Sequence, residues 1–474
     1  MTVHMTTAPI DPTRPVLPAE PAPLYPPTIE PPRDALPVWR FLPTFVRNPL
    51  RTLPLPVYHE PMFVPPGMAG RVAWVTDPKL IEEILLGRHE SFPKSPIEKR
   101  IFGPVLGDGI LLAEGQCWKW QRRITAPLFR HGDLMKLVPD MSAAATRLLD
   151  RWRGMSPGRS RRIDPDMTDV TFDVLRATLF DGASDAEAEM LKAQSAIYLE
   201  NTSWDIAYEI MGLPNWVWHP GRRAMTRSAK LMAEMGLSVV ARARTAGWPG
   251  DGLMARLGRA CDPETGKSMG DAQILNNLLT FAAAGHETTA QALTWALYLL
   301  ARAPDWQQKV RQEVVRVAGH GPIEPQHVEA LSITRQVMKE VMRLYPPAPV
   351  LTRMTREETT IGGHTLPAGA MLVIPIYVVH RHRKLWDDPD RFDPTRFTPE
   401  REKQYARAQF MPFGAGPRTC IGMGFAMIEA VVLLAMLVRD AAFSCDAALA
   451  PEPLSRVTLR PKGGMPLSVD MLSH

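Results

Sequence analysis

One of the four cysteines, Cys420, lies in a stretch that could hold a thiolate. Residues 413–422, Phe-Gly-Ala-Gly-Pro-Arg-Thr-Cys-Ile-Gly, place three glycines and a proline around this cysteine, directly before an apolar helix. Glycine tolerates positive φ, so the loop can fold tightly and aim backbone N–H groups at the sulfur. The helix N-terminus adds partial positive charge, and both effects favour thiolate over thiol. We expect Cys420 to be a metal ligand or a nucleophile; the alternative is an inert cysteine buried in a turn.

A second candidate lies in the predicted helix 271–303. The residues that share one face of this helix are small except for the first: Phe281, Ala284, Gly285, Thr288 and Ala292. A flat ligand could therefore approach the backbone there. Glycine in mid-helix costs about 1 kcal/mol relative to alanine, so the sequence gives up local stability at this point. Glu287 stands beside this face, and the alternative is a kinked helix with a solvated Glu287.

A third candidate is the pair Glu340 and Arg343, three residues apart on a helix face. Such pairs are usually solvated and contribute about 0.2–0.5 kcal/mol. The pair stands beside an apolar stripe, so we expect a structural ion pair packed against the core.

Together these motifs resemble those of the cytochrome P-450 superfamily, from about Arg71 to the C-terminus. The superfamily's haem-binding pattern Phe-x-x-Gly-x-Arg-x-Cys-x-Gly is matched by Phe413, Gly416, Arg418, Cys420 and Gly422. Residues 284–289 match the oxygen-binding groove, Ala-Gly-x-(Asp/Glu)-Thr-(Thr/Ser). Residues 394–397 match the Pro-x-Arg-Phe segment, which is joined in the family to the Glu-x-x-Arg pair.

The resemblance implies a role for each of these residues. Cys420 would be the axial ligand of the haem iron, in a loop completed by Phe413, Gly416 and Gly422. Thr288 would hydrogen-bond the activated oxygen and Glu287 would supply protons through water, in a groove opened by Ala284 and Gly285. The fold and the haem loop would be held by Glu340, Arg343 and Arg396, and the haem propionates by Trp118, Arg122, Arg353 and Arg418.

The function implied is a haem-thiolate monooxygenase, with haem b as cofactor and O2 as co-substrate. It would oxidise a hydrophobic small molecule with two electrons that come ultimately from NAD(P)H. No flavin or iron–sulfur module fits in this chain, so a separate ferredoxin or flavodoxin with its reductase is expected. The alternatives are a haem-thiolate peroxygenase or isomerase, whose members commonly lose the acid–threonine pair, and a non-catalytic haem-binding sensor.

The elements expected around these residues are mainly α-helical, with a small β region. We predict a Pro-rich arm, extended or disordered, over residues 1–35, and one cytochrome P-450 domain over residues 36–474. The haem would lie between the helix 271–303 and the helix 423–442 that follows the Cys loop. The C-terminal segment is predicted to form a hairpin that turns at Gly463-Gly464. The substrate pocket should draw on residues near Phe281 and Ala284, on segments 93–112, 204–218 and 348–351, and on a lid containing Trp204, Met211, Trp216 and Trp218.

Composition excludes other classes. The 474 residues are 45% hydrophobic and carry a formal charge of +5 without a Lys/Arg block, so disorder and nucleic-acid binding are not expected. The four cysteines are far apart and form no CxxC pair, and the histidines 364, 380 and 382 are not spaced as a zinc site. The sequence shows no secretory signal and no 18-residue uncharged apolar run. We expect a cytoplasmic monomer whose membrane contact is at most peripheral.

Overall fold

The computed structural model describes residues 22–66, 70–156, 158, 160–179, 184–210, 213 and 216–473. The first part of the expected arm and Met211 of the expected lid lie outside these residues. The α-helices are α1 Val38–Arg47, α2 Pro78–Glu82, α3 Pro96–Leu106, α4 Gly115–Thr125, α5 His131–Met135, α6 Val138–Arg153, α7 Asp164–Thr178, α8 Asp185–Glu200, α9 Thr202–Ile210, α10 Arg222–Thr245, α11 Leu253–Arg259, α12 Asp271–Arg302, α13 Pro304–Ala318, α14 Pro325–Val328, α15 Ser332–Leu344, α16 Ile376–Val379, α17 Pro399–Glu402 and α18 Met423–Asp440.

Shorter helical turns and strands complete the chain. The turns are η1 Pro49–Thr52, η2 Leu55–Tyr58, η3 Glu83–Gly87, η4 Ala126–Phe129, η5 Pro394–Phe397 and η6 Gly416–Arg418. The strands are β1 Met62–Phe63, β2 Val72–Val75, β3 Ser160–Arg162, β4 Leu351–Met354, β5 Thr359–Ile361, β6 His364–Leu366, β7 Met371–Ile374, β8 Ala441–Ser444, β9 Pro453–Ser455, β10 Leu459–Pro461 and β11 Pro466–Met471.

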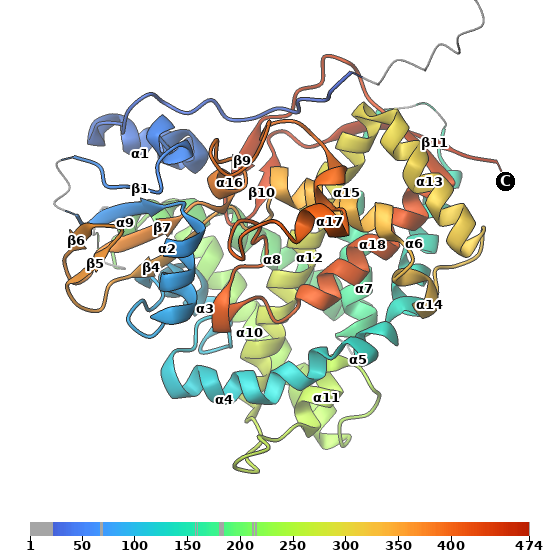
Figure 1. Ribbon diagram of the computed structural model, residues 1–474. Coiled ribbons are helices and arrows are strands. Elements are labelled where there is room, and N and C mark those ends of the chain that lie inside the picture. Colours follow the sequence, from blue (N-terminus) through green and yellow to red (C-terminus); the bar gives the residue numbers. More distant parts are fainter. Residues whose placement is uncertain are drawn as a thin grey trace, which may run out of the picture.

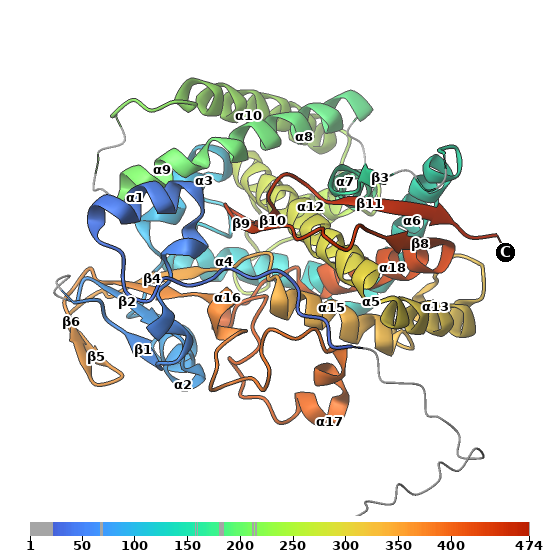
Figure 2. The same ribbon diagram turned by 90° about the horizontal axis from the view of Figure 1, so that it is seen from above.

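The long helix α12 runs through the middle of the molecule (Figure 2). Its 32 residues span about 48 Å at 1.5 Å per residue. Asp271 in its first turn and Arg302 in its last turn complement the helix dipole. Ala303 leaves the helical conformation because the following Pro304 disfavours it. The prediction of one helix across the whole domain is confirmed.

Two apolar clusters meet along α12. Its C-terminal half packs with α6, α7, α15 and α18 in one cluster, and its N-terminal half packs with α3, α10 and α11 in the other. Helix α18 is buried on all sides from Ile428 to Asp440, as expected for a helix that is apolar all round. The helical core thus holds α12 and α18 in fixed positions relative to each other.

The strands form small sheets, of which those containing β1, β2, β4 and β7 and β5 and β6 lie at one side of the helical body (Figure 1). The largest has the order β1-β2-β7-β4, in which β2 and β7 are parallel and the other pairs are antiparallel. Strands β5 and β6 form a hairpin that turns at Gly362-Gly363. The mainly α fold with a small β region is confirmed.

The predicted C-terminal hairpin is placed wrongly. The hairpin that forms pairs β9 with β10 and turns at residues 456–458. Gly463 and Gly464 have φ of +83° and +90°, and they lead the chain out of β10 into β11, which pairs with β3 and β8 in another sheet. Glycine suits both positions of this turn, because their positive φ is a backbone conformation that other residues rarely adopt.

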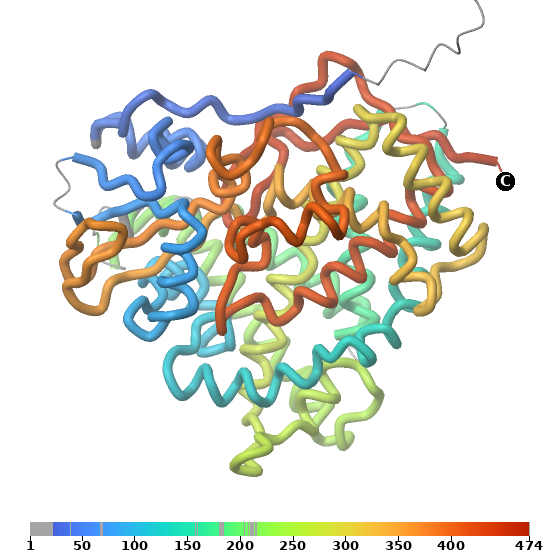
Figure 3. Tube along the Cα trace, in the orientation of Figure 1, coloured from blue at the N-terminus to red at the C-terminus, as the bar shows by residue number. Residues whose placement is uncertain are grey.

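The described part of the arm, residues 22–35, runs extended along the surface of the body (Figure 3). The carbonyl of Leu24 accepts a 2.9 Å hydrogen bond from Phe392 N–H, and the hydroxyl of Tyr345 donates to the Pro27 carbonyl at 2.8 Å. The N–H of Ile29 donates to the hydroxyl of Tyr377 at 3.3 Å. This segment is therefore bound to the domain along its length. Within the described residues, we find no helix with the length and apolar character needed to cross a bilayer.

Candidate active site

A large cavity of about 1140 Å³ opens between the middle of α12 and the loop before α18. Cys420 lines it from the loop, and Thr288 and Glu287 line it from α12. Most of the other lining residues are apolar. A cavity of this kind, with few polar groups, suits a bound small molecule.

The Cys loop owes its path to a close approach at Gly416. This glycine has φ of +77°, and a Cβ there would lie 2.1 Å from the carbonyl oxygen of Leu85 in η3. Only glycine fits, because the obstacle is backbone. The N–H of Cys420 donates to the Phe413 carbonyl at 2.9 Å, and the hydroxyl of Thr419 donates to the Gly416 carbonyl at 2.7 Å. These bonds close the loop and leave Cys420 facing the cavity.

Opposing effects act on the Cys420 thiol. Burial raises the pKa of its thiol above the usual value, while the Gly422 N–H and the Arg122 guanidinium oppose that shift only in part. A bound metal ion deprotonates a coordinating thiol outright, so the site suits a metal ligand better than a free nucleophile.

Three arginines gather at the cavity wall near the Cys loop. The Arg418 guanidinium lies 4.4 Å from the Trp118 ring and donates to the Ala113 carbonyl at 2.8 Å. Arg122 donates to the Thr419 carbonyl at 3.1 Å, and Arg353 donates to the carbonyl of its neighbour Thr352 at 2.7 Å.

These arginines have few anionic partners of their own. Burial lowers the pKa of Arg122, Arg353 and Arg418, which shows that their charges are poorly solvated. One carboxylate, Glu114, forms an ion pair with this group, at 3.1 Å from Arg418. The arrangement fits a ligand that brings more than one carboxylate, as the two propionates of haem do.

The groove on α12 is formed without a break in the helix. Residues 281–289 all have α-helical conformation. The Thr288 hydroxyl donates to the Ala284 carbonyl at 2.7 Å, which leaves its oxygen lone pairs able to accept. Glu287 is half-buried, and its Oε1 accepts a 2.6 Å hydrogen bond from the hydroxyl of Thr458.

Gly285 serves helix packing as well as the groove. A Cβ at this position would lie 3.3 Å from a methyl group of Leu175 in α7. The missing side chain therefore lets α7 approach α12 closely. Its neighbour Ala284 lines the cavity.

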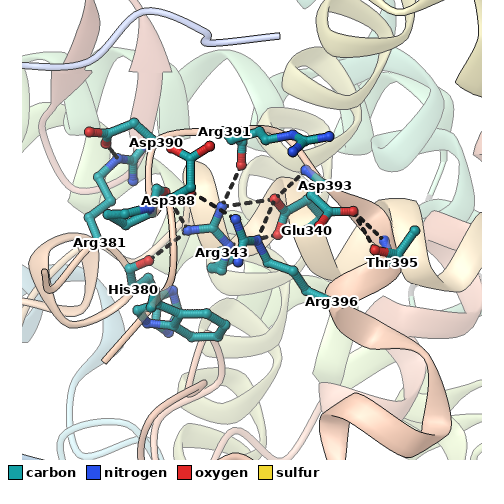
Figure 4. Close-up of polar contacts among 12 residues, drawn as sticks. Glu340, Arg343, His380, Arg381, Asp388, Asp390, Arg391, Asp393, Thr395 and Arg396 are labelled. Carbon is teal, nitrogen blue, oxygen red and sulfur yellow. Dashed lines mark hydrogen bonds and ion pairs between the residues drawn. The ribbon is translucent and has the colours of Figure 1, made fainter. Parts of the chain in front are cut away.

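The Glu340–Arg343 pair is completely buried and holds the loop 388–393 (Figure 4). The Glu340 carboxylate accepts from Arg343 Nε at 2.7 Å and from the Asp393 N–H at 2.8 Å. Nε of Arg396 lies 3.7 Å from Glu340 Oε1. Arg343 also donates to the carbonyl of His380 at 2.8 Å and to two carbonyls of the loop, those of residues 389 and 391. The structure thus brings the three predicted residues together as a structural cluster.

His380 takes part in the same region as a neutral acceptor. Its Nε2 accepts a 2.9 Å hydrogen bond from Met411 N–H, and burial lowers its pKa to about 3. His380 and His382 lie in the turn after α16, whereas His364 lies on β6.

The lining of the cavity agrees only in part with the predicted segments. Residues of 94–111, Phe281, Ala284 and 348–351 line it as expected. The proposed tryptophan lid is not found in the described residues: Trp204, Trp216 and Trp218 are exposed and do not line the cavity.

Sequence reasoning missed two parts of the site. Helix α1 contributes Phe41, Leu42 and Phe45 to the cavity wall; their spacing of one and four residues was the available signal. Glu429 of α18 is completely buried, and burial raises its pKa to about 8. In the described structure, neither oxygen of this carboxyl has a hydrogen-bond partner of good geometry. A glutamate inside an otherwise apolar helix was the signal for that residue.

Comparisons with known proteins agree with this geometry. The sequence model of the family described as "Cytochrome P450" matches residues 58–466. The cytokinin hydroxylase of Arabidopsis thaliana is 31% identical over 83% of this chain and 77% of its own. The taurochenodeoxycholic 6 alpha-hydroxylase of Sus scrofa is 30% identical over 83% of this chain and 81% of its own. The crystal structure of the cytochrome P450DA heme domain superposes with a TM-score of 0.76 at 26% identity and covers 87% of this chain and 90% of that one.

The chain belongs to the cytochrome P450 family. It is a haem-thiolate monooxygenase of hydrophobic substrates, with haem b as cofactor, O2 as co-substrate and electrons from a redox partner. When bound, the haem supplies the oxygen activation, and the protein supplies position, access and protons.

Proposed function

We propose that Cys420 is the axial ligand of the haem iron and that Arg122, Arg353 and Arg418 bind its propionates. A single arrangement carries this proposal: the cysteine, the arginines and the α12 groove all line one apolar cavity. Trp118 supports Arg418 through its ring face. Gly416 and Gly422 complete the loop, and Phe413 accepts the Cys420 N–H through its carbonyl.

The proton route in this proposal uses Glu287 and Thr288. The Thr458 hydroxyl donates to one oxygen of Glu287, which orients the carboxyl at the cavity wall. The Thr288 hydroxyl is oriented by the hydrogen bond that it donates to the Ala284 carbonyl. Its oxygen can still accept a hydrogen bond from a group on the cavity side. Glu287 then exchanges protons with water, and Thr288 holds the oxygen that receives those protons in place through a hydrogen bond.

Electrons come, in this proposal, from a ferredoxin or a flavodoxin with its reductase. This partner would dock near the Cys420 loop, where basic residues would suit an acidic protein. The protein is proposed to act in the cytoplasm as a monomer and to touch membranes at most peripherally.

The intact Glu287–Thr288 pair favours oxygen activation over a peroxygenase, an isomerase or a sensor. Consumption of NAD(P)H with a surrogate reductase, tied to product formation, separates a monooxygenase from these alternatives.

The first test is the difference spectrum of the reduced protein with and without carbon monoxide. We expect a strongly red-shifted Soret band, because the Cys420 thiolate would supply a ligand to the iron that carries the CO. Cys420→Ser should abolish this band, while Cys445→Ser, a cysteine far from the cavity, should keep it. A Cys420→Ser spectrum identical to that of the wild type would remove Cys420 as the ligand.

A further inference from the structure

The turn between β9 and β10, residues 456–458, places a cation in the wall of the cavity. Arg456 is half-buried and donates to the carbonyls of Arg47 and Ser455 at 3.1 and 3.3 Å. Within the described chain no carboxylate forms an ion pair with it. Its guanidinium therefore has donors left for a ligand.

The other cations of the cavity wall have an assigned partner. Lys94 pairs with Glu98 at 2.8 Å, and Arg256 pairs with Asp133 at 3.2 Å. The three arginines near the Cys loop belong to the proposed propionate site. Arg456 lies on a different element, next to the C-terminal end of α1.

The surroundings of Arg456 carry an excess of positive charge. The nearby carboxylate, Glu452, is already taken by Arg51 at 3.0 Å and Lys462 at 3.3 Å, which hold its pKa at about 2. Arg460 on β10 adds a further positive charge near Arg456. An anion bound at Arg456 would relieve this repulsion.

The turn is held at both ends, so the site is organised before a ligand binds. Asn48 accepts from the Ser455 N–H at 3.3 Å and donates to the Pro453 carbonyl at 2.9 Å, which ties β9 to η1. At the other end, Thr458 is bonded to Glu287. Arg456 is therefore only two residues from the group that orients the proposed proton donor.

The wall between these groups is apolar. It includes Phe41 and Phe45 of α1 and Leu50 and Leu53 beside η1. A ligand that binds Arg456 and reaches the α12 groove along this wall is elongated and apolar, with its charge at one end.

We propose that Arg456 binds the carboxylate of an elongated apolar substrate and so orients the chain toward the α12 groove. This inference rests on the proposed function, because it names the substrate class of that site. A guanidinium matches a carboxylate with two parallel hydrogen bonds, which gives orientation as well as affinity.

The test is isothermal titration calorimetry of the haem-loaded protein with decanoate and with decan-1-ol. These ligands share a chain and differ in charge. We expect decanoate to bind more tightly, with an affinity that falls as salt rises. Arg456→Gln should weaken decanoate binding by about tenfold or more and leave decan-1-ol within about twofold. Arg456→Lys should retain part of the preference for decanoate over decan-1-ol, because lysine keeps the positive charge but cannot donate two parallel hydrogen bonds to a carboxylate.

Arg460→Gln is the matched control, since Arg460 lies four residues away and does not line the cavity. It should leave decan-1-ol binding unchanged and weaken decanoate binding far less than Arg456→Gln does, because Arg460 adds positive charge to the region without lining the cavity. An equal loss of decanoate and decan-1-ol binding in Arg456→Gln would overturn the proposal and assign Arg456 to the structure of the α1 end. Loss of binding only to vesicles of anionic lipid would overturn it in favour of a membrane headgroup. The carbon monoxide spectrum of each variant reports the haem site separately, so the proposed function is judged independently.

Discussion

At the scale of single residues, the site depends on hydroxyl and carboxyl groups placed at the cavity by α12. Thr288 and Thr294 form the same kind of bond, each donating to the carbonyl four residues before it. Thr288 lines the cavity, whereas Thr294 is buried away from it. Substitution of each threonine therefore distinguishes a function of the hydroxyl in the cavity from a contribution to the structure of the helix.

We expect Thr288→Ala to keep its haem and to divert electrons into hydrogen peroxide. Without the hydroxyl, protons reach the reacting oxygen less selectively, so product per NAD(P)H should fall by about 10-fold or more, a typical loss for a positioned proton-transfer group. The measurement is NAD(P)H consumed, peroxide formed and product formed in one assay. Thr294→Ala should keep the wild-type ratio. Unchanged coupling in Thr288→Ala would contradict the role.

The buried Glu429 makes stability depend on pH. Its pKa rises from 4.5 to about 8 because burial penalises the carboxylate. The folded pKa lies above the unfolded one, so the stabilisation is fully present below about pH 4.5 and is lost as pH rises through about 8. Glu429→Gln removes the ionisation. Thermal unfolding from pH 5 to 9 should show the variant gaining stability relative to the wild type as pH rises. Parallel curves would show that Glu429 does not ionise in this range.

At the scale of elements, two helices and a loop decide where the reactive groups meet. Helix α12 passes between two apolar clusters, and α18 is buried on all sides, so neither can shift without loss of packing. The loop before α18 is closed by hydrogen bonds and by its contact with η3. The Glu340–Arg343 cluster holds the preceding segment in the same way.

Gly416 tests this loop, with Gly463 as its matched control. Both have positive φ, but a Cβ at Gly463 would meet open space. Gly463→Ala should lose about 1 kcal/mol, the cost of a left-handed backbone at alanine. Gly416→Ala should lose more and should bind haem less well, because its Cβ overlaps the backbone of Leu85. Thermal unfolding and the ratio of Soret to protein absorbance measure both effects. Equal losses in the two variants would show that the contact with η3 is not tight.

At the scale of the whole molecule, the cavity is assembled from segments far apart in the chain. Helix α1, the loop before α3, the middle of α12, β4 and the β9–β10 turn all contribute to one wall or another. The described arm residues 22–35 add a further long-range connection, since they bind to Phe392 next to the Glu340 cluster. The N-terminal region thus contributes α1 to the cavity wall and binds, through residues 22–35, to the segment that the Glu340–Arg343 pair holds.

The sequence by itself determined the class of the protein and its main helices. The Cys loop, the Glu-x-x-Arg pair and the α12 groove are local patterns, and each requires particular residue types at fixed spacing. The long helix and the hairpin at Gly362-Gly363 follow from periodicity and glycine placement, which are also local.

Only the tertiary structure decided which distant segments and side chains contact one another. The Gly463-Gly464 turn could have closed a hairpin, and only the pairing of β11 with β3 and β8 excluded it. The Cys420 thiol, the Glu429 carboxyl and the unpaired Arg456 depend on what surrounds them, because desolvation and ion pairing arise from packing between distant segments. The position of α1 in the cavity wall and of the tryptophans outside it depends on the same long-range packing.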